Sequence, residues 1–138
     1  SVSVECVPVE GFIGESVILK CSFGHKPKTV FWRYNDSRTV CNIIDGKADF
    51  DDQDTVYKGR VTISQSEIEK GNFSIMLSDV KESDSGLYTC TTPNIKTLTL
   101  ELTVKARRTA PGNGESPRRA DGLLMFLLGC ALLYSLTF

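Results

Sequence analysis

The sequence has little of what catalysis or tight metal binding requires. Among its 138 residues there is one histidine, His25, so no serine–histidine or cysteine–histidine pair is available to activate a nucleophile. None of the five cysteines stands in a C-x-x-C pair, which excludes a zinc ribbon and a thioredoxin-like redox site. We therefore expect no enzyme activity, no cofactor and no bound metal.

An excess of basic residues is also missing. The formal net charge is −1 at pH 7, whereas a nucleic-acid-binding protein needs a concentrated basic surface. The acidic residues between Asp45 and Asp54 have calcium-loop spacing at Asp49-x-Asp51, but the glycine at the sixth place and the closing glutamate are absent. We expect no nucleic-acid partner and a solvated loop at the acidic cluster.

No segment before residue 106 shows a helical period, and alternation of apolar and polar residues dominates instead. The alternating segments are 16–23, 29–34, 60–64, 73–77, 87–90 and 97–105. Clusters of glycine, asparagine and aspartate separate them at short intervals. The pattern predicts an all-β fold, a sandwich of two antiparallel sheets that cover each other's apolar faces.

Two cysteines fall on the inward faces of these strands. Cys21 and Cys90 are in phase with the apolar residues, and Trp32 points the same way. A bond between the two sulfurs would join the sheets through the core, with the indole packed on it. Closing so long a loop would stabilise the fold by about 4 kcal/mol in a chain-entropy treatment. Disulfides form in oxidising compartments, so we expect an extracellular protein.

Cys21, Trp32 and the segment 84–90, "DSGLYTC", resemble the immunoglobulin domain pattern, whose last part reads D-x-G-x-Y-x-C. The resemblance covers residues 1–105. The long interval between the two cysteines is similar to that of the variable type, with its extra pair of strands. The resemblance implies an immunoglobulin-like V-type β-sandwich whose characteristic disulfide joins the two cysteines.

The resemblance also assigns structural roles. It implies that Tyr88 forms the tyrosine corner and that Arg60 pairs with Asp84. Within the superfamily, the motifs look most like the polymeric immunoglobulin receptor and related leukocyte receptors. Those proteins carry a second cysteine where Cys41 stands, but its usual partner directly follows the tryptophan, and this chain has Arg33 there.

Cys6 and Cys41 are therefore left without an assigned partner. In a variable-type domain their strands lie at opposite margins of the sandwich, several spacings of about 4.8 Å apart, whereas a disulfide needs Cα atoms within about 7 Å. An intramolecular bond is disfavoured. The remaining interpretations are a disulfide-linked dimer or partner, and free, partly buried thiols.

A flat face of the sandwich is the expected binding site. The residues that alternate with the core on this sheet are Phe31, Arg33, Leu87, Thr89 and Thr91, with Asn42 and Ile44 on the neighbouring strand. Exposed apolar side chains such as Phe31 and Leu87 often mark partner surfaces. The resemblance implies the same, since many relatives bind through this sheet.

Two sequons fit an extracellular protein. Asn35-Asp36-Ser37 and Asn72-Phe73-Ser74 both match the acceptor for N-glycosylation, and both fall beside predicted turns. The first ten residues contain neither a basic start nor an apolar run. We therefore expect the numbering to begin at a mature end, after removal of a leader.

The C-terminal part has a different composition. Residues 106–122 form a polar stalk with proline and glycine, which we expect to be disordered, and residues 123–138 form an apolar run. As a helix this run is about 24 Å long, short of a hydrocarbon core of about 30 Å. Small residues at Gly112 and Gly114, a polar spacer and an apolar tail match a glycosylphosphatidylinositol (GPI) signal. The alternative is a short transmembrane helix.

Together these features predict a cell-surface glycoprotein on the outer face of the plasma membrane, with no part in the cytoplasm. We expect its V domain to bind a protein ligand or co-receptor in immune regulation or cell adhesion. Two alternatives stay open. One is lipid- or calcium-dependent ligand capture at the loop tips, and the other is a disulfide-linked subunit or decoy of a receptor complex.

Overall fold

The computed structural model describes residues 6–94 and 96–107. The stalk beyond Arg107, the apolar run 123–138 and the GPI signal predicted around Gly112 and Gly114 lie outside the described residues. Within those residues, no helix has both the length and the apolar character that a membrane span needs.

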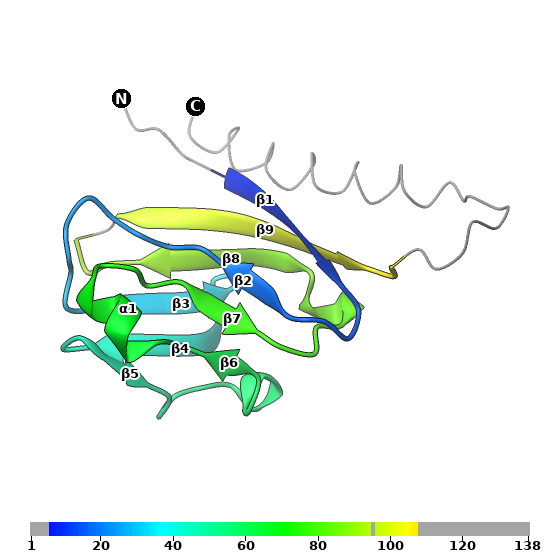
Figure 1. Ribbon diagram of the computed structural model, residues 1–138, viewed down its shortest axis with the longest axis horizontal. Helices are drawn as coiled ribbons and strands as arrows, with labels where there is room; N and C mark the ends of the chain where they lie inside the picture. The colour runs from blue at the N-terminus through cyan, green and yellow to red at the C-terminus, as the bar shows by residue number, and fades with distance from the viewer. Residues whose placement is uncertain (1–5, 95, 108–138) are drawn as a thin grey trace, which may run out of the picture.

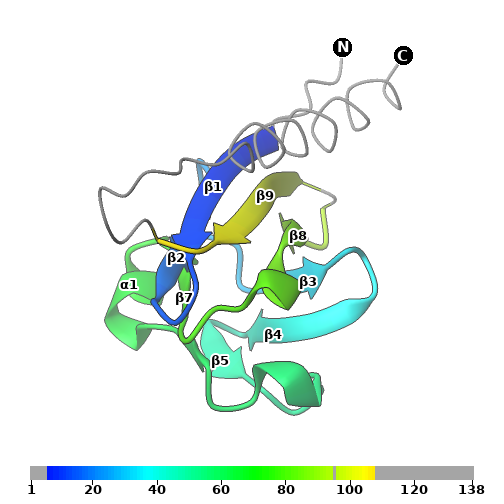
Figure 2. The same cartoon turned by 90° about the vertical axis from the view of Figure 1, so that its right-hand side faces the viewer.

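Two sheets pack face to face, as the alternation predicts (Figures 1 and 2). The large sheet has six strands in the order β1 (Cys6–Phe12), β9 (Thr97–Lys105), β8 (Gly86–Thr91), β3 (Val30–Tyr34), β4 (Arg38–Ile44) and β5 (Lys47–Asp49). The small sheet has three strands in the order β2 (Val17–Leu19), β7 (Ile75–Leu77) and β6 (Val61–Thr62). The predicted all-β sandwich is confirmed. One pairing is parallel: β1 runs alongside β9 from Cys6 to Phe12.

Short helical turns interrupt the sandwich. The sequence shows no helical period before residue 106, yet one short helix, α1 (Gln65–Glu69), occurs there. Two 3₁₀ turns, η1 (Thr55–Tyr57) and η2 (Glu82–Asp84), also occur. Ser64 caps α1, because its Oγ accepts a hydrogen bond from the Glu67 amide at 3.3 Å. A single turn held by its cap is too short to show a helical period in the sequence.

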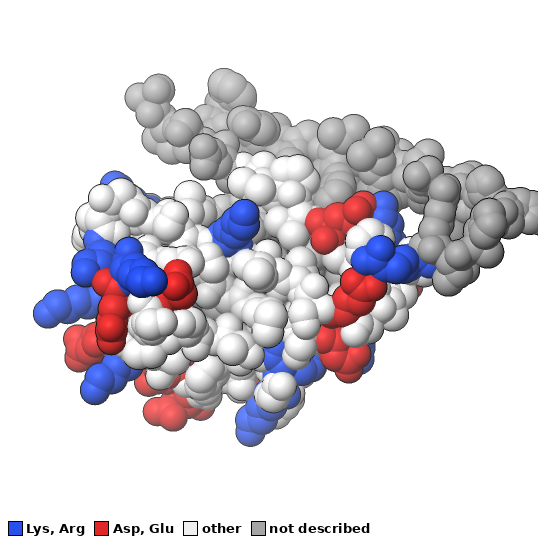
Figure 3. Space-filling view, in the orientation of Figure 1, with Lys and Arg blue, Asp and Glu red and all other residues white. Residues whose placement is uncertain are grey.

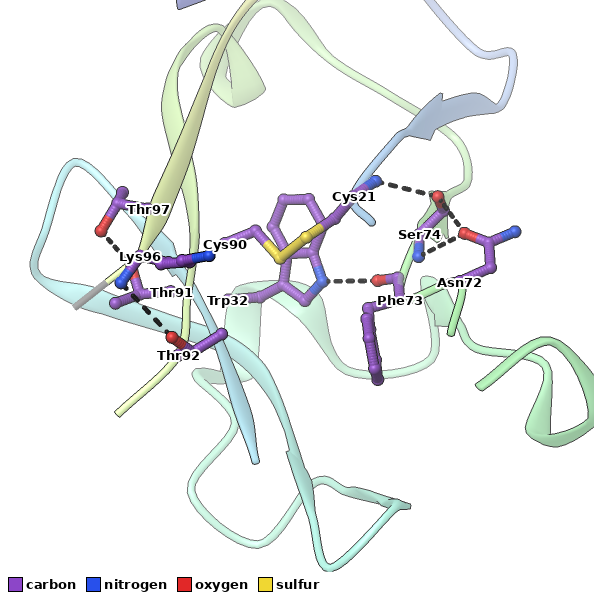
Figure 4. Close-up of a disulfide and its surroundings, with 10 residues drawn as sticks. All are labelled: Cys21, Trp32, Asn72, Phe73, Ser74, Cys90, Thr91, Thr92, Lys96 and Thr97. Carbon is purple, nitrogen blue, oxygen red and sulfur yellow. Dashed lines mark hydrogen bonds between the residues drawn. A yellow bond between two sulfur atoms is a disulfide. The ribbon is translucent and has the colours of Figure 1, made fainter. Parts of the chain in front are cut away.

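The core is built around the disulfide between Cys21 and Cys90 (Figure 4). Cys90 lies in β8 of the large sheet, and Cys21 follows β2 of the small sheet. Trp32 is fully buried beside the bond, and its Nε1 donates to the Phe73 carbonyl oxygen at 2.9 Å. The Phe73 amide donates in turn to the Cys21 carbonyl oxygen at 2.8 Å. Sulfur and indole thus connect the two sheets at the same place.

A second set of contacts closes the end of the sandwich near η2. The Tyr88 hydroxyl donates to the Asp84 carbonyl oxygen at 2.8 Å, which is the tyrosine corner that the resemblance implied. The Arg60 guanidinium contacts the Asp84 carboxylate at 2.5 Å, and both side chains are largely buried. The Lys81 amide also donates to this carboxylate at 2.8 Å. Because the buried charge is paired and hydrogen-bonded, removing either partner would leave the other uncompensated.

A salt bridge lies just after the end of β9, where the chain leaves the sandwich. The Arg107 guanidinium donates to both carboxylate oxygens of Glu15, at 2.6 and 2.8 Å. It also lies 4.2 Å from the centre of the Phe12 ring, in a cation–π contact. Arg107 is thereby attached to the turn between β1 and β2, and the hydrogen bonds lower the pKa of Glu15.

Glycine is required at the start of β8. Gly86 has a φ of +152°, and a Cβ there would stand 2.6 Å from Cε1 of Tyr34. Tyr34 cannot move away easily, since its hydroxyl donates to the Ser85 carbonyl oxygen at 2.8 Å and its ring packs on Tyr88 at 5.1 Å between centres.

We predict that Gly86→Ala lowers the free energy of unfolding by about 3 kcal/mol, through backbone strain and overpacking against Tyr34. Urea unfolding followed by the fluorescence of Trp32, the single tryptophan, measures the change. Gly24→Ala is the matched control, because a Cβ at Gly24 meets no atom within 4 Å. Equal stability of the two variants would contradict the packing described for Gly86.

Candidate functional site

The outward residues of four neighbouring strands, β9, β8, β3 and β4, form one surface, which we call the front face. They are Thr97, Thr99, Leu87, Thr89, Thr91, Phe31, Arg33, Thr39 and Ile44. The register aligns them in rows across the sheet. Thr97, Thr91 and Phe31 form one row, and Thr99, Thr89 and Arg33 form the next. Hydrogen-bonded strands hold these rows flat, so the front face is preformed.

Arg33 lies across the middle of the front face. Its guanidinium carbon is 5.2 Å from the centre of the Phe31 ring. Its Nη1 donates to Oδ1 of Asn42 at 2.6 Å and to the Trp32 carbonyl oxygen at 2.9 Å. Partial burial lowers the pKa of Arg33, but an arginine keeps its charge at neutral pH. The face therefore presents a fixed positive charge against an aromatic ring.

Asn42 does not belong to the accessible surface, contrary to the sequence expectation. It alternates outward, opposite Phe31 and Asp49, yet it is only 3% exposed. Strand β5 flanks it on one side, and the Arg33 guanidinium hydrogen-bonds to its side chain. Asn42 positions Arg33 instead of contacting a partner itself.

The other predicted residues come together. Phe31, Leu87, Thr89 and Thr91 are partly exposed on adjacent strands, and Ile44 is 41% exposed near the end of the sheet. Thr97 and Thr39 complete the accessible surface, although the prediction did not include them. Thr99 projects to the same side, opposite Thr89, but it is only 6% exposed. The alternation of threonine with leucine in 97–105 could have identified the two residues of β9. The resulting surface mixes threonine hydroxyls with a few apolar groups around Arg33, and Glu101 projects on the same side, opposite Leu87.

The two further cysteines are far apart. Cys6 is in β1 and Cys41 is in β4, and the strand order separates them by four strand spacings, about 19 Å. They cannot bond to each other within one domain. Cys6 is disulfide-bonded, so the interpretation of a free thiol is wrong for it.

Cys41 is the free thiol among the described cysteines, and it is fully buried. It lies opposite Trp32, where the register of β3 and β4 shifts. Burial raises the pKa of the Cys41 thiol to about 12. The hypothesis of an intermolecular disulfide through Cys41 is therefore wrong for the folded domain, because the sulfur is neither accessible nor ionised.

The acidic loop uses its carboxylates for turns. Oδ1 of Asp49 accepts the Asp51 amide at 3.0 Å, and Oδ1 of Asp54 accepts the Val56 amide at 3.0 Å, which caps η1. Over residues 6–94 and 96–107, no group of three or more side chains is arranged to hold a metal ion. His25 is exposed beside Phe23, with ring centres 6.3 Å apart.

The two sequons lie on different parts of the domain. Asn35 is exposed in the turn between β3 and β4, at the end of the front face, and its Oδ1 accepts the Leu87 amide at 3.0 Å. Asn72 precedes β7 and is bridged to Ser22 on the small sheet.

Comparison with known proteins gives the family. The pattern of the Immunoglobulin V-set domain family matches residues 6–105. A CD276 antigen homolog of Xenopus laevis is 33% identical over 113 residues, which cover 76% of this chain and 37% of that protein. The human V-set domain-containing T-cell activation inhibitor 1 is 30% identical over 95 residues, 65% of this chain and 34% of that protein. The chain thus spans little more than a third of these relatives.

Among solved structures, the extracellular domain of the voltage-gated sodium channel beta4 subunit superposes with a TM-score of 0.59 and 28% identity. The match covers 78% of this chain and 98% of that one. That structure is described as a parallel homodimer that explains the role of beta4 in cell–cell adhesion. None of these three is the polymeric immunoglobulin receptor, to which the sequence motifs look most similar.

We predict that Cys41 in the folded protein resists iodoacetamide at pH 8 and reacts once the chain is denatured in urea. Mass spectrometry of the Cys41 peptide measures the labelling. The raised pKa of the Cys41 thiol also makes the free energy of unfolding depend on pH in alkaline solution. The unfolded thiol ionises near 9.0 and the folded one near 12, so stability falls as pH rises between these values. Labelling at the same rate in native and denatured protein would show that Cys41 is accessible.

Proposed function

The chain belongs to the immunoglobulin V-set domain family, whose relatives are receptors and adhesion proteins without enzyme activity, and on that premise we propose that it is a cell-surface recognition protein. In this proposal the V domain binds a protein on another cell through the front face, in immune regulation or adhesion. The single observation that carries the proposal is the cross-strand surface with Arg33 stacked on Phe31 at 5.2 Å.

The chemistry of the front face favours a protein partner with a flat surface of its own. A preformed sheet loses little conformational entropy on binding. Arginine and aromatic side chains provide most of the energy at protein interfaces when a partner excludes water from them. The positive charge of Arg33 favours a partner that presents a carboxylate opposite it, while the threonines around it offer hydroxyls and methyl groups.

The relatives support the same class of function. By its name, the human relative inhibits T-cell activation, and the beta4 structure concerns cell–cell adhesion. A protein on a neighbouring cell fits both descriptions. The beta4 homodimer also supports a second candidate, in which the front face binds another copy of this chain on an opposing cell.

We predict that Thr91→Lys on the front face lowers adhesion between cells displaying the full chain and T cells by about tenfold or more. The substitution introduces a charge beside Phe31, where the partner would have to desolvate it. Thr62→Lys is the matched control, since Thr62 is exposed on the opposite, small sheet. Surface staining verifies that both variants are displayed equally.

The outcomes separate the candidates. Loss of adhesion with Thr91→Lys alone supports the front face. If two cell populations that both display the chain adhere to each other, and Thr91→Lys abolishes this adhesion, the second candidate is the function. Equal adhesion by both variants and the unchanged chain would refute binding through this face.

We also propose that the chain is held at the outer membrane surface by a GPI lipid. The support is the composition of residues 112–138, in which small residues at Gly112 and Gly114 precede a polar spacer and an apolar run.

We predict that phosphatidylinositol-specific phospholipase C releases most of the surface-stained protein from intact cells that express the full chain. The released protein should lack residues 123–138 when analysed by mass spectrometry. A transmembrane protein displayed on the same cells is the control, because its release would show loss of surface protein without cleavage of a lipid anchor. Staining that persists, with the apolar run still present, would establish a membrane-spanning helix instead.

A further inference from the structure

The outer surface of the small sheet, which we call the back face, combines a sequon with an exposed apolar pair. Asn72 lies opposite Ser22, and Ile18 lies opposite Met76, in one continuous antiparallel register. Side chains at every second position share a face, so Asn72, Ser74 and Met76 all project outward. The buried side chains between them, Phe73 and Ile75, point into the core.

Ile18 and Met76 are an unusual pair for a protein surface in water. They are 55% and 37% exposed and are direct cross-strand neighbours. Figure 3 shows that the middle of this side of the molecule, over β2 and β7, carries few charged side chains, which gather instead at its two ends. Lys20, the next outward residue after Ile18, is exposed beside the pair. A cross-strand apolar pair in an area with few charges attracts other apolar surfaces.

The Asn72 side chain is held in place with one amide hydrogen to spare. Its Oδ1 accepts hydrogen bonds from the amide and the hydroxyl of Ser74, at 3.1 and 2.6 Å. Its Nδ2 donates one hydrogen to Oε1 of Glu67 at 3.0 Å. An amide nitrogen carries two hydrogens, so the second is available for substitution. Figure 4 shows Nδ2 pointing away from the disulfide and the indole.

Ser74 connects the sequon to the core. Its hydroxyl donates to Asn72 and also accepts the Cys21 amide at 2.9 Å. Phe73, the middle residue of the sequon, accepts the hydrogen bond from the Trp32 indole at 2.9 Å. The tripeptide is therefore a rigid attachment point, fixed to the disulfide at one end of the back face.

We propose that Asn72 carries an N-linked oligosaccharide that lies along the back face and covers Ile18 and Met76. In the attachment step a bond forms between Nδ2 and the anomeric carbon of the sugar, the bond from that carbon to the lipid diphosphate carrier breaks, and Nδ2 loses one proton. Met76 is four residues from Asn72 along an extended chain, about 13 Å, which a branched oligosaccharide spans. Oligosaccharides are bulky and solubilising, so the apolar pair is removed from contact with other proteins.

The position of the oligosaccharide matters for the proposed function. Asn72 is on the sheet opposite the front face, so a sugar there leaves Phe31 and Arg33 open. Asn35 differs, because it adjoins Leu87 at the end of the front face. Coverage of Ile18 and Met76 by the oligosaccharide does not depend on what the front face binds, and its test is independent of adhesion.

The test uses the full chain, expressed in eukaryotic cells behind a cleavable leader, with Ser37→Ala to remove the other sequon. This variant keeps Asn35 and its hydrogen bond to Leu87. Peptide mass spectrometry determines whether Asn72 carries a sugar. Hydroxyl-radical labelling of the folded protein then compares Met76 before and after an amidase removes the oligosaccharide and converts Asn72 to aspartate.

We expect a sugar on most Asn72 peptides, and labelling of Met76 and Ile18 that rises severalfold after its removal. Ile44, 41% exposed on the front face, is the internal control and should not change. A Ser74→Thr variant, which keeps the sequon and the hydroxyl, should reproduce the result. An Asn72 peptide without sugar, or Met76 labelling that is the same in both forms, would overturn the proposal, whatever the adhesion assay shows.

Discussion

The Cys21–Cys90 disulfide, with Trp32 against it, is the contact on which the rest of the structure depends. It joins the small sheet to the large one, and in a chain-entropy treatment it contributes about 4 kcal/mol by restricting the unfolded chain. The indole accounts for much of the surrounding geometry. Its Nε1 holds the Phe73 carbonyl, which fixes the Asn72 sequon, and the backbone oxygen of Trp32 accepts a hydrogen bond from Arg33. The core thus positions a residue on each of the two outer surfaces.

These two surfaces have opposite characters. The front face has a fixed charge and an aromatic ring among threonines, and arginine and aromatic side chains are enriched at protein interfaces. The back face has an exposed aliphatic pair beside a sequon, and an apolar pair without a cover promotes nonspecific association. An oligosaccharide on the back face and a bare front face would give the domain one side for recognition. The orientation of the domain at the membrane would then decide what the front face meets.

Strand alternation in the sequence was enough to predict the sandwich and most of the front face. In β3, β8 and β9 each step of two residues returns to the same face, so the alternation alone places Phe31, Thr89 and Thr91 outside. The burial of Asn42 could not be predicted in this way. It depends on the way the Arg33 side chain folds back over its own sheet and hydrogen-bonds to Asn42. This is a tertiary effect. The single turn of α1 could not be predicted either, because it is stabilised by its cap and not by a periodic pattern.

The neighbours of strand β9 determine how it would carry force in the proposed function. It pairs with β8 from Thr97 to Leu102 on one side and with β1 from Thr99 to Lys105 on the other. If the chain is anchored at a cell surface and binds a partner as proposed, tension would enter through the sheet and leave along the axis of β9. The ladders on both sides are then loaded in shear, so many hydrogen bonds share the force instead of unzipping one after another. The ion pair of Arg107 with Glu15 lies on the same path and would be the first link to yield.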